Sequence, residues 1–450
     1  MREVLERIYR AGLDPVRPDR LIRNGVTVTG RTLRVAGWDG RVDLDTVRRI
    51  VVIGAGKASA GMALALEELL GERIAGGTIA TKTGHGEPLA RIEVIESGHP
   101  VPDEESQRAA GAIVRHCREA DAGTLVIGLI SGGGSALLAA PLETAEGMPR
   151  LDLDDKKRVT ELLLACGATI QETNCVRKHL SQVKGGRLGA LIHPARSLNL
   201  ILSDVTGDRL DTIASGLTAP DATTYADALA ITDRYGVTAS LPAAARGVLE
   251  AGRDGRLPET PKPGAAELAG VHNVLLGSNL AALGAARREA QALGWPTVAL
   301  SSQIVGEARE VAKVYLAIGS DIARHGVAAS APCCVLGGGE TTVTLRGDGA
   351  GGRSQEMALA FLTESEDHPE RARLHFLAAS TDGTDGPTDA TGAFADPAVY
   401  DAARRQGLNP RRYLDRNDSY TFFDRAGGLL RTGPTRTNVG DLQVLLITEP

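Results

Sequence analysis

Residues 124–138 read TLVIGLISGGGSALL, and this stretch decides the fold class of the chain. The run Thr124–Ile130 is almost entirely apolar, which predicts a strand buried on both faces, as in a parallel sheet covered by helices. Ser131 and three consecutive glycines follow, and the apolar residues after Ser135 begin a new segment. In open α/β sheets, ligands bind beyond the carboxyl ends of the strands. The stretch therefore predicts an α/β fold with a ligand-binding loop at residues 131–135.

The same order of apolar run, short loop and amphipathic helix recurs along the chain and predicts further βα units. Residues 26–37 alternate apolar and polar side chains and predict a hairpin, and helices are expected at 153–168 and 170–185. The segment 252–270 is rich in Pro, Gly and charge, so we expect a linker or a long surface loop there. Two α/β domains follow, at residues 1–260 and 261–450. The expected strands lie at 50–53, 77–81, 93–97, 124–130, 198–203, 273–276, 296–300, 333–336, 341–345 and 374–379.

The composition excludes several classes of protein. The net charge of -6 and the 3% aromatic content argue against a general nucleic-acid binder. No apolar run reaches the roughly 18 residues of a membrane span, so we expect no membrane partner. The first residues, MREVLERIYRAG, lack the apolar core of a signal peptide, and the five cysteines form no CxxC pair. We therefore expect a cytoplasmic protein with free thiols.

Glycine is the unusual residue, with 54 of 450 positions against an average of about 7%. The turn Gly54-Ala55-Gly56-Lys57 after a strand resembles a dinucleotide fingerprint, but its third glycine is replaced by Ser59. We expect such a turn to offer backbone N–H groups to an anion, with Lys57 as a functional cation or a solvated surface residue. Candidate phosphate-binding residues are Gly54, Gly56, Ser131, Gly132, Gly133, Gly134, Ser135, Gly338, Gly339 and Glu340, with Arg353 at the start of the helix that follows.

Acidic residues at expected strand ends are candidates for a metal site. Asp204 and Asp208 lie in one loop, and Asp382 and Asp385 lie in another. Mg²⁺ takes one or two carboxylates together with substrate phosphates, although each aspartate could equally satisfy its own turn. His99 is either a substrate contact or a structural hydrogen-bonding residue.

Basic residues also gather in the segment NCVRKHLSQVKGGRLG. Arg177 and Lys184 would share one face of the expected helix, as a patch for an acidic substrate or as a solvated surface.

Many of these segments together resemble the glycerate 2-kinases whose C-terminal region is the MOFRL domain. The resemblance covers nearly the whole chain. In the N-terminal half it rests on VVIGAGKAS (51–59), SGHPVPDEES (97–106), LISGGGSALL (129–138), TNCVRKHLSQVKGGRL (173–188) and SDVTGDRLDTIASGLTAPD (203–221). In the C-terminal half it rests on LGGGETTVTL (336–345), GGRSQEMAL (351–359), STDGTDGPTDATGAFAD (380–396) and GPTRTNVGDLQVLL (433–446).

The resemblance implies a Rossmann-like N-terminal α/β/α sandwich with a mostly parallel sheet and a C-terminal α/β domain with a mixed sheet. It implies an active site in the cleft between the two domains. The implied reaction is ATP-dependent phosphorylation of D-glycerate at its 2-hydroxyl, giving 2-phosphoglycerate and ADP, with Mg²⁺ or another divalent cation.

Within that reaction, the resemblance makes Lys57 and Arg353 the two basic catalytic residues. Asp204 is the candidate proton acceptor and a candidate metal ligand with Asp208, Asp382 and Asp385. We expect a monomer or a homodimer. The alternatives are an NAD(P)H-dependent hydroxypyruvate reductase, a label that members of the family have carried, and a non-catalytic sensor on the same scaffold.

Overall fold

The structure is a computed structural model that describes residues 1–449, and its contacts divide the chain into two compact units. Unit 1 comprises Met1–Arg20, Asp204–Gly207 and the chain from Gly277 onward, and unit 2 comprises Leu21–Ser203 and Asp208–Leu276. The division expected at 260/261 differs from this one in two respects. The first 20 residues belong with the C-terminal half, and the chain leaves unit 2 for the last time only after Leu276.

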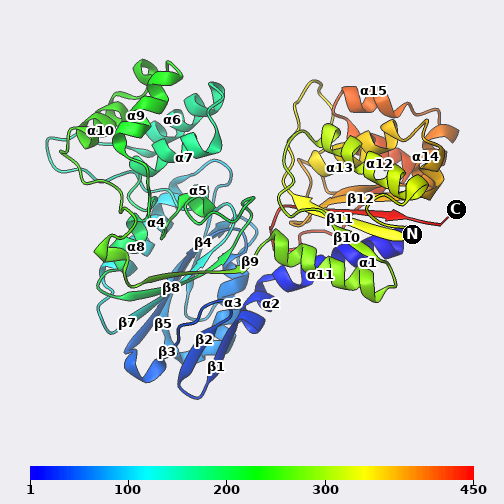
Figure 1. Cartoon of the computed structure of the whole chain (residues 1–450). Helices are drawn as coiled ribbons and strands as arrows, with labels where there is room; N and C mark the ends of the chain where they lie inside the picture. Colours follow the sequence, from blue (N-terminus) through cyan, green and yellow to red (C-terminus); the bar gives the residue numbers. More distant parts are fainter. Residues whose placement is uncertain (450) are drawn as a thin grey trace. The chain divides into compact units, whose positions relative to one another are not determined.

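A six-stranded sheet forms the centre of unit 2, in the order β6-β5-β4-β7-β8-β9 (Figure 1). The pairings from β6 to β8 are all parallel, so the carboxyl ends of these strands share one edge. All residues of β7 are buried, as the apolar run at its position predicts. The mostly parallel sheet expected for the N-terminal half is therefore confirmed. The strands are β4 (Arg49–Ala55), β5 (Ile74–Lys82), β6 (Glu93–Ser97), β7 (Thr124–Ile130), β8 (Arg196–Leu202) and β9 (Val271–Gly277).

Helices of unit 2 surround this sheet and also form a separate group beyond the carboxyl ends of its strands. Figure 1 shows α6, α7, α9 and α10 gathered above the short helix α5, which directly follows β7. These four helices pack around a common apolar core that includes Tyr225, Val248 and Leu249. The helices are α2 (Pro18–Gly25), α3 (Ser59–Leu70), α4 (Glu104–Arg118), α5 (Gly134–Leu137), α6 (Leu153–Ala165), α7 (Ile170–His179), α8 (Arg187–Ile192), α9 (Tyr225–Arg234) and α10 (Ala243–Arg253).

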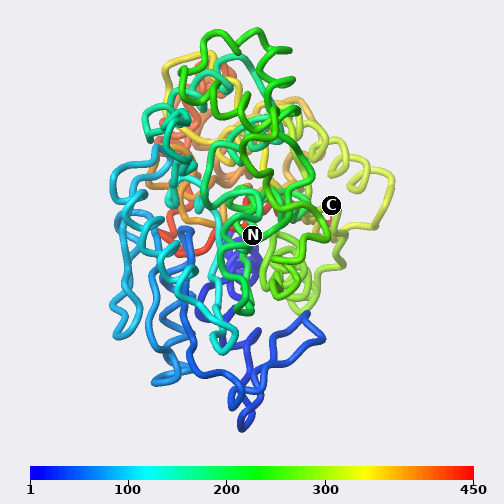
Figure 2. Tube along the Cα trace, turned by 90° about the vertical axis from the view of Figure 1, so that its left-hand side faces the viewer, coloured from blue at the N-terminus to red at the C-terminus, as the bar shows by residue number. Residues whose placement is uncertain are grey.

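A small antiparallel sheet completes unit 2 and confirms the predicted hairpin. It contains β1 (Val26–Thr29), β2 (Thr32–Val35) and β3 (Val42–Asp43), with Val26 opposite Val35. In Figure 2 this part of the chain is the dark blue segment at the lower end of the trace.

Unit 1 is built on a mixed six-stranded sheet in the order β10-β11-β15-β12-β13-β14, as expected for the C-terminal half. Strands β11 and β12 both run antiparallel to the central β15, and Asp441 lies opposite Gly339 on one side and Ser380 on the other. The carboxyl ends of β11 and β12 therefore meet at the amino end of β15. The strands are β10 (Thr297–Ala299), β11 (Cys333–Gly339), β12 (Leu374–Ser380), β13 (Gly392–Ala395), β14 (Leu429–Leu430) and β15 (Asp441–Ile447).

The helices of unit 1 cover this mixed sheet, and α12 and α13 contribute much of its apolar core. Phe361 of α13 stacks on Phe376 of β12, with 4.6 Å between the ring centroids. The helices are α1 (Arg2–Leu13), α11 (Asn279–Ala292), α12 (Ala308–His325), α13 (Arg353–Glu364), α14 (Pro397–Arg405), α15 (Pro410–Asp415) and α16 (Ser419–Ala426).

The N-terminal helix α1 is part of unit 1, although it is distant in sequence from the rest of that unit. It packs against α11 and β15, and Figure 1 shows it beside α11. Its Tyr9 is fully buried and donates a hydrogen bond of 2.6 Å to the carbonyl oxygen of Ser380. The first residues thus complete the core of the C-terminal sheet.

Two local expectations from the sequence are wrong. Residues 341–345 form no strand, because Thr342 makes only an isolated bridge to Glu307 and Leu345 is 78% exposed. The helix expected at 170–185 ends at His179. The segment 252–270, expected as a linker or a long surface loop, is a loop of unit 2 that packs through Thr260, whose hydroxyl donates to Asp221 at 3.1 Å.

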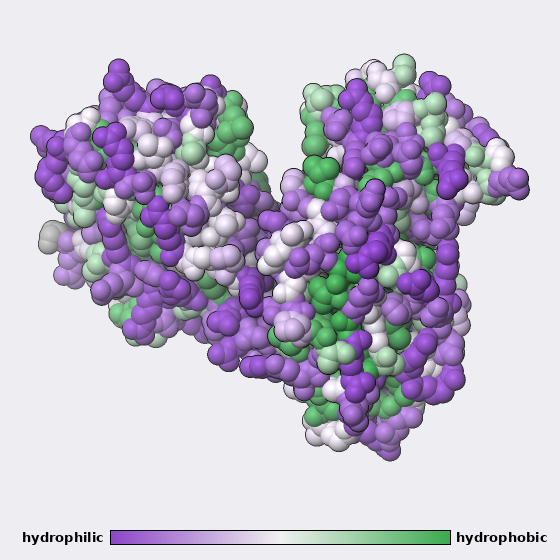
Figure 3. Space-filling model, turned by 180° about the vertical axis from the view of Figure 1, so that it is seen from behind, coloured by the Kyte–Doolittle hydropathy of each residue, from purple (hydrophilic) through white to green (hydrophobic). Residues whose placement is uncertain are grey.

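The face of the molecule that Figure 3 draws is mostly polar. Figure 3 shows a largely hydrophilic face, with smaller groups of hydrophobic residues between the polar ones. Within the part of the chain that the structure describes, no helix combines the length and apolar character needed to cross a membrane.

We predict that Tyr9→Ala lowers the free energy of unfolding of unit 1 by about 3–5 kcal/mol, because it removes a fully buried aromatic ring. Urea unfolding followed by tryptophan fluorescence measures this, since the chain has two tryptophans and Trp295 reports on unit 1 when Trp38 is replaced by Phe. The control is Tyr9→Phe, which keeps the ring and should cost only about 1 kcal/mol. An unchanged midpoint in Tyr9→Ala would contradict the integration of α1 into this unit.

Candidate active site

The loops that follow β4 and β7 lie side by side at the carboxyl edge of the sheet in unit 2. The N–H of Lys57 donates to the carbonyl of Gly132 at 2.9 Å, and the N–H of Ser131 donates to the carbonyl of Ala55 at 3.1 Å. The N–H of Ala58 donates to the hydroxyl of Ser131 at 3.0 Å. These bonds fix the two loops to each other, so the expectation that the Lys57 turn offers unoccupied backbone donors is wrong for Lys57 and Ala58.

Glycine is required where these loops touch. A Cβ atom at Gly56, whose φ is +148°, would lie 2.0 Å from the hydroxyl oxygen of Ser131. A Cβ at Gly133, whose φ is +81°, would lie 3.0 Å from the ring of His99 and 3.4 Å from Cγ of Lys57. The absence of side chains therefore brings Lys57, His99 and the glycine loop into contact range.

Two further glycines, Gly54 and Gly134, also allow close packing. A Cβ at Gly54 would lie 2.3 Å from the carbonyl oxygen of Leu129, and one at Gly134 would lie 2.7 Å from that of Ala55. Any role of these glycines in holding a nucleotide stays a prediction.

A cavity of about 410 Å³ opens beside this edge, under the helices α6 and α7. Its polar wall combines the loop after β7 with basic side chains from three segments of unit 2. The residues concerned are His99, Gly133, Ser135, Lys156, Arg177 and Lys184.

Three basic side chains of the cavity, those of Lys156, Arg177 and Lys184, bind only neutral oxygens, whereas Lys157 and Glu161, which also line it, are each in an ion pair. Arg177 donates to the hydroxyl of Ser135 at 2.7 Å, and Lys184 donates to the carbonyl and hydroxyl oxygens of the same serine at 2.6 and 3.0 Å. Lys156 donates to the carbonyls of Ala140 and Leu180 at 3.2 and 3.0 Å. Among residues 1–449, none of the three forms an ion pair with a carboxylate.

Burial and mutual repulsion disfavour the charged forms of these groups. Burial, with the neighbouring Arg177, lowers the pKa of Lys156 to about 7 and that of Lys184 well below its ordinary value. Burial, with the nearby Lys57, lowers the pKa of His99 to about 4, so this imidazole is neutral at pH 7. These basic groups thus lack a negative partner, and an anionic ligand bound beside them would favour their charged forms.

The basic segment NCVRKHLSQVKGGRLG was expected to be either a patch for an acidic substrate or a solvated surface, and the structure distinguishes the two. Arg177 lies on α7, but Lys184 lies in the loop after it, so the two do not share a helix face. They nevertheless converge on Ser135, and Lys184 is only 1% exposed. The interpretation as a solvated surface is therefore wrong for both residues. His99 also lines the cavity, in agreement with a substrate contact.

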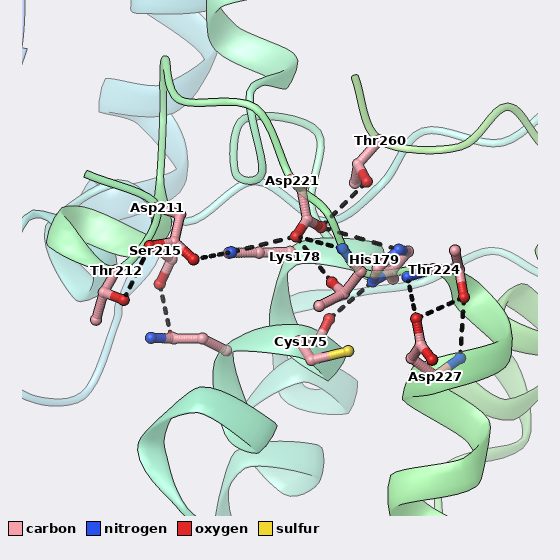
Figure 4. Close-up of polar contacts among 12 residues, drawn as sticks. Cys175, Lys178, His179, Asp211, Thr212, Ser215, Asp221, Thr224, Asp227 and Thr260 are labelled. Atoms are coloured by element: carbon pink, nitrogen blue, oxygen red, sulfur yellow. Dashed lines mark hydrogen bonds and ion pairs between the residues drawn. The ribbon is translucent and has the colours of Figure 1, made fainter. Parts of the chain in front are cut away.

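Lys178, which lies between them in sequence, has a structural role. Figure 4 shows Asp221 between Lys178 and His179, with Thr260 reaching it from another segment. The Lys178 Nζ atom is 3.3 Å from Oδ1 of Asp221. This buried cluster joins α7 to the 211–221 segment, in which Ser215 accepts or donates a 2.8 Å hydrogen bond to Ser135.

The candidate acids after β8 fall in different units. Asp204 groups with unit 1 and Asp208 with unit 2, and both are partly exposed. Asp208 has φ +54°, in the left-handed region that favours glycine. Their roles as metal ligands, and that of Asp204 as a catalytic residue, stay predictions.

In unit 1, Arg353 begins α13 and forms a three-residue ionic cluster at the amino end of β15. Its Nε and Nη2 atoms donate to the two carboxylate oxygens of Asp441 at 2.7 and 2.9 Å, and Nη1 donates to Glu340 at 2.6 Å. The paired carboxylates hold the pKa of Arg353 above its ordinary value. Burial raises the pKa of Asp441 to about 7, against the lowering effect of Arg353. The guanidinium is 28% exposed and fixed in orientation.

The other candidate residues of unit 1 surround this cluster. Asp385 is buried, and its two oxygens accept the N–H groups of Ser354 and Gln355, so it caps α13. Asp382 accepts hydrogen bonds from Ser380 and Thr384 within its own turn. Within residues 1–449, no group of three or more His, Cys, Asp or Glu side chains is arranged to hold a metal ion. The metal roles of both aspartates stay predictions.

Gly338 and Gly339, proposed for nucleotide binding, pack closely against neighbouring elements. A Cβ at Gly338 would lie 2.0 Å from Oδ1 of Asn279, and one at Gly339 would lie 2.2 Å from the carbonyl oxygen of Ile304. Their binding role, and that of Glu340, stays a prediction.

Two residues of these clusters were not identified from the sequence. Lys156 occupies a segment without a recognisable motif, and only the fold brings it to the cavity. Asp441 is the first residue of β15, directly before an apolar run. An isolated acid at the start of a strand does not by itself indicate a functional site.

Comparison with known proteins gives the family. Residues 4–250 match the model of a domain of unknown function called DUF4147, and residues 333–441 match the MOFRL family. A protein of Agrobacterium vitis, provisionally named a hydroxypyruvate reductase, is 40% identical over 99% of this chain and 94% of its own length.

Two further relatives are named as kinases. A glycerate 2-kinase of Pyrococcus horikoshii is 39% identical over 100% of this chain and 98% of its own length. A crystal structure of a glycerate kinase from Thermotoga maritima matches with a TM-score of 0.85 and 36% identity, covering 99% of both chains. Because the identity extends over the full length and both halves of the fold agree, the chain belongs to the glycerate kinase family that combines the DUF4147 and MOFRL regions.

Proposed function

We propose that this protein transfers the terminal phosphoryl group of ATP to the 2-hydroxyl of D-glycerate, giving 2-phosphoglycerate and ADP. The observation that carries the proposal is a group of basic side chains without a carboxylate partner at the carboxyl edge of the parallel sheet, beside Lys57 and a glycine-rich loop. Both substrates are anions, and phosphoryl transfer depends mainly on positioning and on stabilising negative charge. The kinase names of the full-length relatives support the same reaction.

Lys57 and Arg353 have different electrostatic environments, and we assign them different tasks. Lys57 lies next to the glycine loop and the neutral His99, so we infer that it stabilises charge on the transferred phosphoryl group. Arg353 is held by two carboxylates, so its guanidinium is oriented before any ligand arrives. We infer that its remaining N–H groups orient the substrate or the transferred group.

The carboxylates of the chain suit a divalent cation that is held partly by phosphate oxygens of the substrate. No all-protein cage is present among the described residues, whereas Mg²⁺ ordinarily binds one or two carboxylates plus phosphate oxygens. Asp204, Asp208, Asp382 and Asp385 are the candidates to supply those carboxylates, and Asp204 is also the candidate to accept the 2-hydroxyl proton. When bound, the cation would neutralise phosphate charge.

A reductase is the less favoured alternative. The turn after β4 lacks the third glycine of a dinucleotide fingerprint, and the next strand ends in Lys82 where a ribose-binding acid is expected. Incubation with hydroxypyruvate and NADH or NADPH, followed by absorbance of the reduced nicotinamide, distinguishes the two activities.

Cytoplasmic location, the monomeric or homodimeric state and the absence of nucleic-acid partners stay predictions, as does a site in a cleft between the domains.

We predict that Lys57→Ala and Arg353→Ala each lower turnover by about 10³-fold or more, because each removes a cation that stabilises the transferring group. The measurement is ADP release with ATP and D-glycerate, compared with a panel of other small hydroxy acids. Lys313→Ala and Arg346→Ala are the matched controls, since both side chains are exposed and outside these clusters. Near wild-type turnover in both site variants would refute the assignment.

We further predict that Asp441→Asn lowers kcat more than it changes KM for ATP, because an amide cannot hold Arg353 through two charged contacts. The wild-type kcat should fall as the pH decreases through about 7, where Asp441 becomes protonated. In Asp441→Asn this acidic limb should disappear. If the kcat of the variant falls with the same midpoint, a group other than Asp441 causes the acidic limb.

A further inference from the structure

The cavity of unit 2 is also lined by large apolar side chains. Val101, Leu164 and Ile170 line it and are 62%, 64% and 54% exposed, which is unusual for large hydrophobic side chains. Val101 comes from the loop before α4, Leu164 from α6 and Ile170 from the start of α7. The cavity is thus basic on the Ser135 side and apolar at its rim.

We propose that this cavity binds the nucleoside di- or triphosphate of the reaction, with Lys156, Arg177 and Lys184 on the phosphate chain and the apolar rim against the base and sugar. This inference rests on the proposed kinase function and names the binding site of the phosphoryl donor. It also adds three cations that the motifs around Lys57 and Ser131 did not indicate.

The number of charges favours a phosphate chain over the carboxylate of the hydroxy acid. One carboxylate would favour the charged form of a single basic group and leave the other two without a negative partner. A polyphosphate tail carries enough negative charge for all three, and a planar base suits an exposed apolar rim.

The hydrogen bonds around Ser135 show that the cations are arranged in advance. Its hydroxyl oxygen accepts from both Arg177 and Lys184, so its proton must go to Ser215, 2.8 Å away. Ser215 in turn donates to Asn174 at 2.9 Å. The two charges are therefore held at one point by a neutral hydroxyl with no capacity to neutralise them.

An unsatisfied hydroxyl on the same cavity supports a polar ligand. Thr173 lines the cavity and is 2% exposed, yet its hydroxyl oxygen has no hydrogen-bond partner. Buried hydroxyls are normally paired, so this one is available to a bound molecule.

The test is calorimetric titration of ADP into the full chain without D-glycerate. Lys184→Met and Lys156→Met should each raise Kd about 10- to 100-fold, as expected for loss of a charged hydrogen bond. Arg253→Gln is the matched control, because this arginine is on α10, exposed, paired with Asp254 and outside the cavity; its Kd should stay within about twofold of wild type. Circular dichroism checks the fold of each variant.

Titrations with inorganic tripolyphosphate and with the Leu164→Ser variant distinguish the contribution of the basic side chains to affinity from that of the apolar rim. Tripolyphosphate has the phosphate chain without the base, so it should lose affinity in the lysine variants and keep it in Leu164→Ser. ADP should lose affinity in all three. Since Leu164 is mostly exposed, Leu164→Ser tests the proposal even if Lys184→Met does not fold.

Unchanged ADP binding in Lys156→Met and Leu164→Ser would overturn the inference, as would variants in which only the KM for D-glycerate rises. Because these titrations need no catalysis, ADP binding that depends on the cavity residues supports the site even if the chain releases no ADP with D-glycerate. That result would refute the proposed function alone.

Discussion

The cavity of unit 2 depends on burying basic side chains without giving them a negative partner. Lys184 and Arg177 are directed at one serine hydroxyl, and Lys156 is satisfied only by two carbonyl groups. Such an arrangement opposes folding, because desolvating an unpaired cation is unfavourable. The helices α6, α7, α9 and α10 compensate with their own apolar core, which fixes the walls of the cavity independently of any ligand. A site built in this way is stabilised by the anion that occupies it.

Arg353 of unit 1, in contrast, is paired with carboxylates. Arg353 has two carboxylate partners, one of them buried Asp441, and the segment that carries it is capped by Asp385. Its charge is balanced and its direction fixed, so it contributes orientation more than attraction. The chain thus uses one group of cations to attract anions and another cation to position them.

Much of the fold follows from local patterns. The run Thr124–Ile130 became a fully buried strand, and its glycine loop lies at the edge where α/β sheets bind ligands. The mixed sheet and the reaction came from the resemblance of whole motifs, which reflects common ancestry and not periodicity. Residues 341–345 have the alternation of a strand but lack a partner strand, and a strand is stable only when its backbone groups are paired.

The sequence by itself determined the βα order, the buried strands and the positions at which glycine loops follow them, because these depend on neighbouring residues. Only the tertiary structure decided which distant side chains meet. Arg177 and Lys184 meet Ser135 from 42 and 49 residues away, and Arg353 meets Asp441 from 88 residues away. Residues 1–20 likewise join the C-terminal sheet, because the burial of Tyr9 requires a core that its own neighbours in sequence do not supply. Charge compensation and burial are properties of the folded chain, so whether a lysine is a solvated residue or part of a binding site was decided by packing.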